Sequence, residues 1–177
     1  MADIASKAGL KKSSLFHHFP TKDGLYRDVL DQVLGEIGGA VYAAIGAADR
    51  GFLERLDSAS AAVARSLGED ATRARLIMRE LLNHDGADAH VDMIVDVIAA
   101  TAKFFEDGAA AGAWPRQDFH QAVLTIAGVH CFYFAVPDVT TRVSGLDPFH
   151  TDAVERRIHA VQVQVRQLLG LASTMRD

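Results

Sequence analysis

The stretch from Ala2 to Lys22, ADIASKAGLKKSSLFHHFPTK, has the pattern of two short helices joined by a tight turn. Gly9 ends the first helix, because a turn at this point needs a residue that accepts a positive φ. Ala5 is small where the second helix has to cross closely, four residues before that glycine. Pro20 closes the second helix by disfavouring the α conformation at Phe19. This spacing predicts a helix-turn-helix.

The outward face of the second helix carries cations and short hydroxyls, which suit phosphate oxygens and base edges. These side chains are Lys11, Lys12, Ser13, Ser14, His17 and His18. Thr21 can cap a third helix that begins at Lys22, whose first amides can receive a phosphate. Lysines on a short helix are usually only a solvated face. The turn glycine, the closing proline and the capped lysine together favour contact with DNA.

The longer stretch DIASKAGLKKSSLFHHFPTKDGLYRDVL closely resembles the DNA-binding signature of the tetracycline-repressor-like (TetR) family, over about residues 2–30. It has the family's Asp-Ile-Ala, Ala-Gly, His-Phe and helix-opening lysine at their fixed spacings. Phe16 stands where the family usually has a tyrosine whose hydroxyl reaches a phosphate. The resemblance implies a set of DNA-contacting residues, namely Lys11, Lys12, Ser13, Ser14, Phe16, His17 and Lys22.

The family has a full amphipathic helix before this motif, whereas here the motif begins directly after Met1. We therefore expect the first helix of the DNA-binding domain to be missing. Ile4, Leu15 and Phe19 then lack one packing partner. The alternative to a DNA-binding regulator is a helical ligand-binding dimer that does not bind DNA because of this truncation.

Charge is unevenly distributed along the chain. Residues 1–27 hold five basic and two acidic side chains, a balance of +3, which leaves −8 for the remainder of a chain whose net charge is −5. A basic head on an acidic body indicates contact with DNA at one end. Cys131 is the single cysteine, which excludes an internal disulfide and favours a reducing cytoplasm. We expect no signal peptide and no contact with a membrane.

Strand signals are scarce, so the sequence predicts an all-α protein. We expect residues 1–45 to form the helix-turn-helix domain with a connector helix, and residues 46–177 to form a ligand-sensing and dimerisation domain. Gly38 and Gly39 either bend the connector or admit a close neighbour. The expected later helices cover about 52–67, 70–84, 90–111, 118–135 and 151–171, with loops at 83–88 and 137–148.

The last helix places apolar residues at alternating steps of four and three, and the helix before it has one apolar face. Periodicity alone fits either an internal core or a four-helix interface with a second copy. The family resemblance favours the interface, because these regulators generally dimerise through their last two long helices. The expected dimer residues are Val123, Ala127, Val154, Ile158, Val161, Val165 and Leu168.

The stretches RARLIMRELLNHDG, CFYFAVPDV and SGLDPFH resemble, more weakly, the ligand-sensing domain of one branch of the family. This resemblance implies a small apolar effector, and aromatic residues and methionines are suited to line its site. Ordinary core packing is the alternative for each of them. The expected ligand residues are Met78, Leu82, Phe104, Phe105, Trp114, His130 and Phe134.

The sequence gives little support for a metal site or for enzyme activity. The His/Asp-rich segment with His84, Asp85, Asp88, His90 and Asp92 matches no known ligand spacing, so a solvated turn is favoured over a metal site. Adjacent His130 and Cys131 point in different directions along a helix, which argues against a catalytic dyad. We expect no enzyme activity and no cofactor. The sequence predicts a homodimeric, ligand-responsive transcriptional regulator, a repressor released from a palindromic double-stranded DNA operator by a small apolar ligand.

Overall fold

The structure is a computed structural model that describes residues 1–83 and 89–171, and in these residues all regular structure is helical. The prediction of an all-α fold with a helix-turn-helix head is confirmed. The described helices are α1 (Ala2–Lys7), α2 (Lys12–His18), α3 (Lys22–Gly46), α4 (Phe52–Gly68), α5 (Arg73–Asn83), α6 (Ala89–Ala110), α7 (Phe119–Ala135), α8 (Pro137–Ser144) and α9 (Thr151–Leu168).

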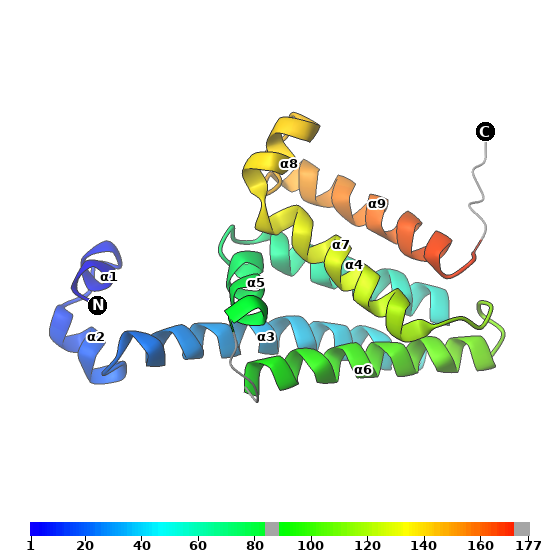
Figure 1. Ribbon diagram of the computed structural model, residues 1–177, viewed down its shortest axis with the longest axis horizontal. Helices are drawn as coiled ribbons and strands as arrows, with labels where there is room; N and C mark the ends of the chain where they lie inside the picture. Colours follow the sequence, from blue (N-terminus) through cyan, green and yellow to red (C-terminus); the bar gives the residue numbers. More distant parts are fainter. Residues whose placement is uncertain (84–88, 172–177) are drawn as a thin grey trace. The chain divides into compact units, whose positions relative to one another are not determined.

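The chain forms two compact units, Met1–Val33 and Leu34–Asp177. The division falls inside α3, so this one continuous helix starts in the first unit and ends in the second (Figure 1). The sequence-based division instead kept α3 whole and placed it with the helix-turn-helix domain. We describe the two units separately.

In the first unit, α1 and α2 pack against each other, and each buries one apolar side chain. Ala5 on α1 and Leu15 on α2 are 2% and 5% exposed. Gly9 has φ +66°, the left-handed conformation that the sequence required for the turn. The Thr21 hydroxyl accepts a hydrogen bond of 3.0 Å from the Gly24 amide, which caps the start of α3.

In the second unit, α7 contacts α4, α5, α6, α8 and α9, and α4 also packs against α9. Figure 1 shows α7 crossing the middle of this bundle. An aromatic cluster joins the end of α6 to the start of α4. The Trp114 indole N–H donates to the Phe105 carbonyl over 2.8 Å, and its ring meets Phe52, Phe104 and Phe105 nearly edge-on.

One segment expected to be a loop, residues 137–148, is partly helical, because α8 covers Pro137–Ser144. Pro137 occupies the first helical position, where its missing N–H removes no intrahelical hydrogen bond. Gly145 ends the helix with φ +72°. Pro137 and Gly145 are therefore the start and stop signals of a short helix.

Asp118 caps α7 as the sequence predicted, because its side chain accepts a hydrogen bond from the Gln121 amide.

Within the described residues no single helix is long and apolar enough to cross a membrane, and only α7 and α8 together, bent by 87°, meet that test of length and composition.

Candidate DNA-binding face and ligand cavity

The outer side of α2 is a basic and polar surface. All seven predicted DNA-contacting residues are exposed, and the buried Leu15 lies among them on the inner side of the helix. We call these seven residues the DNA-facing set: Lys11, Lys12, Ser13, Ser14, Phe16, His17 and Lys22. No acidic residue lies in the first turn of α2 to neutralise this charge.

Phe16 has a structural role beside Lys12. The Lys12 ammonium lies 5.6 Å from the centre of the Phe16 ring, within the range of a cation–π contact. The ring therefore restricts the lysine side chain on the exposed face, although it has no hydroxyl to donate to a phosphate. On α3, Arg27 pairs with Asp23 over 3.1 Å, so this arginine contributes less free charge than the lysines of α2.

The second unit contains an apolar cavity of about 150 Å³. Its walls come from α3, α4, α5, α6, α7 and α9, and most lining side chains are aliphatic or aromatic. The polar residues in the lining are Ser60, Thr101, His130 and Cys131, and none of the described lining residues is Lys, Arg, Asp or Glu. Such a cavity suits an apolar small molecule.

The connector helix α3 forms one wall of this cavity. It contributes Leu34, Ile37, Gly38, Val41 and Ile45. A Cβ atom on Gly38 would lie 3.1 Å from the Val97 Cγ2 atom of α6, so the glycine admits a close neighbour at the cavity wall. Because α3 is continuous from Lys22 to Gly46, close approach rather than a helix break explains this glycine.

Three of the seven predicted ligand residues line the cavity, namely Phe104, Phe105 and His130. The other four lie elsewhere for identifiable reasons. Trp114 is held in the aromatic cluster, and Leu82 is 75% exposed on the surface. Phe134 is fully buried between Tyr133 and Phe149, and Met78 is half-buried on α5 outside the lining.

The predicted dimer residues are mostly buried within the single chain. Val123, Val154, Ile158, Val161 and Val165 are all less than one tenth exposed within the single chain. Val123, Ala127 and Val165 line the cavity. Within the single chain, the stripe therefore lies on the inner face of the bundle. Leu168 is half-buried against the same core.

Helices α7 and α8 carry four exposed apolar residues that the sequence analysis did not assign. Leu124 and Phe132 on α7 are 52% and 64% exposed, and Val139 and Val143 on α8 are 52% and 83% exposed. Helix α7 is apolar on both sides, so periodicity could not tell which side faces the core. We call these four residues the outer apolar face.

His130 is a buried polar residue without a partner. Its side chain is 2% exposed, and neither ring nitrogen has a hydrogen-bond partner. Burial, and secondarily the positive charge of Arg157, lowers the pKa of His130 from 6.5 to about 4. The imidazole is therefore neutral at pH 7, with one donor and one acceptor nitrogen.

Two neighbours of His130, the Cys131 thiol and the Arg157 guanidinium, do not supply a reactive or charged group to the cavity. Burial raises the pKa of the Cys131 thiol to about 11, so the thiol stays protonated and is a poor nucleophile. The Arg157 guanidinium on α9 donates a hydrogen bond to the Val129 carbonyl and lies 4.5 Å from the centre of the Tyr133 ring. Its charge is thus engaged outside the cavity lining.

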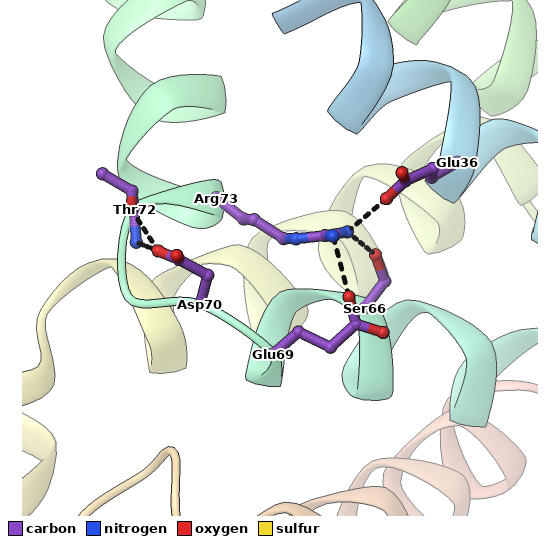
Figure 2. A network of polar contacts seen from close by, with 6 residues as sticks. All are labelled: Glu36, Ser66, Glu69, Asp70, Thr72 and Arg73. Carbon is purple, nitrogen blue, oxygen red and sulfur yellow. Dashed lines mark hydrogen bonds and ion pairs between the residues drawn. The ribbon is translucent and has the colours of Figure 1, made fainter. Parts of the chain in front are cut away.

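A polar network anchors α3 within the second unit (Figure 2). The Arg73 guanidinium lies 2.8 Å from the Glu36 carboxylate of α3 and 2.7 Å from that of Glu69, and donates to the Ser66 hydroxyl over 2.8 Å. Arg73 is only 17% exposed, so these contacts are less screened than an ordinary surface ion pair. The network ties α3 to the end of α4 and the start of α5.

The segment proposed as an alternative metal site is only partly described. His84, Asp85 and Asp88 lie outside the described residues. His90 is buried on α6, with its Nδ1 atom 3.6 Å from a carboxylate oxygen of Glu80. Among the residues that the structure describes, no group of three potential ligands is arranged to hold a metal ion.

Comparison with known proteins agrees with this arrangement. A family model described as bacterial regulatory proteins, tetR family, matches residues 1–29, which contain α1 and α2. The N-terminal segment of the chain is therefore similar to the DNA-binding segment of the tetR family. The matched segment comprises α1, α2 and the start of α3, which include the seven predicted DNA-contacting residues.

A solved tetR-family structure shares the fold over nearly the whole chain. It is that of a bacterial regulatory protein in the tetR family from Rhodococcus RHA1, with a TM-score of 0.60 and 23% sequence identity. The match covers 97% of this chain and 86% of the other. No curated protein sequence matches the chain. The tetR-type fold therefore extends through the second unit, beyond the segment that the family model covers.

Proposed function

We propose that this protein is a DNA-binding transcriptional regulator of the tetR type and a ligand-responsive repressor, which leaves a roughly palindromic operator when a small apolar molecule fills the cavity. The observation that carries this proposal is the double role of α3. The helix begins at Lys22, next to the DNA-facing set, and later supplies five residues to the cavity wall. A ligand that shifts this wall acts directly on the helix that leads to the DNA-binding unit.

The ligand acts only if it binds one conformation more tightly than the other. The cavity offers a physical basis for such a difference, because its wall is shared between α3 and the rest of the bundle. Arg73 holds α3 at Glu36, beside the lining residues Leu34 and Ile37. We propose that the ligand-bound state repositions α3 against this anchor, with weaker binding of the DNA-facing set to the operator as the result.

Proteins of this family act as dimers on DNA, and we propose the outer apolar face as the contact with a second copy. Its four side chains are exposed and apolar, which favours burial against a partner. Gly128, also on the exposed side of α7, has open space around its Cα atom and lets two helices approach closely. Asp138 and Arg142 are both exposed on α8. In a two-fold symmetric dimer, Asp138 of one copy can therefore pair with Arg142 of the other.

DNA binding itself is tested by fluorescence anisotropy with the DNA that adjoins the protein's own gene, across a salt series. We expect saturable binding that is tighter than to scrambled DNA. Lys12→Ala should weaken binding and reduce the slope of log K against log salt by about 1, since one phosphate contact is lost. The matched control is Lys103→Ala, which removes the same charge from α6 in the second unit.

The control should leave affinity and slope unchanged. If Lys12→Ala and Lys103→Ala give equal results, the assignment of DNA contacts to α2 is wrong. If the wild-type protein binds scrambled DNA equally well, the proposal of an operator in this region is wrong.

A further inference from the structure

The described cavity lining has four polar residues, and the polar groups of two of them are already satisfied or weak. The Thr101 hydroxyl donates to the Val97 carbonyl of its own helix over 2.8 Å. The Cys131 thiol is a weak donor. His130, by contrast, brings a strong donor and a strong acceptor into the lining, and neither has a partner. A buried polar group without a partner is destabilising, so a group that satisfies it gains affinity.

The lining also restricts the charge of a ligand. None of its described residues is an acid, a lysine or an arginine, and His130 is uncharged at neutral pH. An ionised ligand would lose its hydration without finding an opposite charge. The guanidinium of Arg157 does not substitute for one, because it is directed to the Val129 carbonyl and the Tyr133 ring.

The size of the cavity sets a third limit. An apolar cavity of about 150 Å³ in an engineered protein is known to hold benzene, and this cavity has the same volume, about 150 Å³. A single ring with a small substituent therefore fits this space.

We propose that the effector of this protein is a neutral, single-ring-sized apolar molecule with one hydroxyl or carbonyl oxygen, which forms a hydrogen bond with the His130 imidazole. The inference rests on the proposed function for its regulatory meaning, since it names the class of molecule that fills the same cavity. A hydroxyl fits either ring nitrogen, because it both donates and accepts. A carbonyl fits only the protonated nitrogen.

The test is isothermal titration calorimetry of the full chain at pH 7.5 with p-cresol, toluene and benzoate, three rings of similar size. We expect p-cresol to bind most tightly. Toluene should bind about tenfold more weakly, since it leaves His130 unsatisfied. Benzoate should give no measurable heat at concentrations that saturate the protein with p-cresol, because its charge has no counterpart in the lining.

His130→Leu isolates the hydrogen bond. In this variant the p-cresol and toluene affinities should become equal to within about twofold, while toluene still binds, which shows that the cavity is intact. The matched control is His120→Leu, since His120 is an exposed histidine on the same helix. It should keep the wild-type order of affinities.

The proposal is overturned if benzoate binds as tightly as p-cresol, if none of the three compounds binds, or if His130→Leu keeps the preference for p-cresol. Should the Leu variant fail to fold, the wild-type order of the three affinities decides the matter alone. The assay contains no DNA, so its failure is separate from a failure of operator binding, which the anisotropy experiment measures.

Discussion

Replacing His130 with leucine should stabilise the protein, and more so in mild acid. At neutral pH the change removes a buried polar group whose nitrogens have no partner. Removing such a group stabilises a folded protein by about 1 kcal/mol. Leucine also fits the apolar surroundings, because the neighbouring lining residues Ile126 and Ala127 are aliphatic. The gain should appear as a higher free energy of unfolding at pH 7.5.

The pH dependence follows from the lowered pKa of His130. The group titrates near 6.5 in the unfolded chain and near 4 in the folded one, so the unfolded state binds more protons between these values. The wild-type contribution to stability is therefore complete above pH 6.5 and is lost as the pH falls towards 4. By linkage the loss is about 2 kcal/mol at pH 5 and about 3 kcal/mol in total.

The assay is urea unfolding at pH 7.5 and at pH 5, at one protein concentration because dimerisation affects apparent stability. Trp114 is the single tryptophan and is 4% exposed, so its fluorescence reports unfolding of the second unit. Subtracting the wild-type free energy of unfolding from that of His130→Leu cancels the contribution of the carboxylates that both proteins share. The difference should grow by about 2 kcal/mol between pH 7.5 and pH 5.

His120→Leu is the control, and its difference from the wild type should not change with pH in this way. An equal pH dependence in the wild type and His130→Leu would refute the reasoning, because it would mean that folding does not lower the pKa of His130.

Two further predictions concern the outer apolar face and the Arg73 network. Phe132→Asp should shift the protein from dimer to monomer in sedimentation equilibrium, whereas Val95→Asp, at an exposed apolar position of α6, should not. A dimer that survives Phe132→Asp contradicts the assigned face. Arg73→Met should lower the free energy of unfolding by about 1 kcal/mol, since it leaves the Glu36 and Glu69 carboxylates without their shared partner. Unchanged stability in urea unfolding would show that the network does not hold α3.

The helix-turn-helix was predictable because its signals are local. The positive φ at Gly9 and the Thr21 cap each depend on residues within a few positions in the chain, and the structure shows both. The start of α7 was predictable for the same reason, because Asp118 caps its own helix. Helix α8 was missed although its signals are also local, because proline and glycine mark loops as well as helix ends.

The cavity and the outer apolar face were not predictable at the level of residues. Helix α7 has apolar side chains on both sides, so Val123 and Phe132 look equally suited to a core or an interface. Only the packing of α4, α6 and α9 around α7 decides between them. The contribution of α3 to the cavity was missed because residues such as Gly38 give no sequence signal for a ligand site. His130 was found, since a polar residue in an apolar stretch is conspicuous.

The central claim is that a dimer of this chain reads a symmetric DNA sequence through α2. The most direct measurement is selection of bound duplexes from a random library by the full-length protein, followed by sequencing. The account predicts one enriched inverted repeat, whose half-sites face the same side of the duplex about one helical turn apart or a multiple of it. Lys12→Ala should reduce the recovery of that repeat. Recovered duplexes without a shared sequence, or with a motif that lacks two-fold symmetry, would contradict the account.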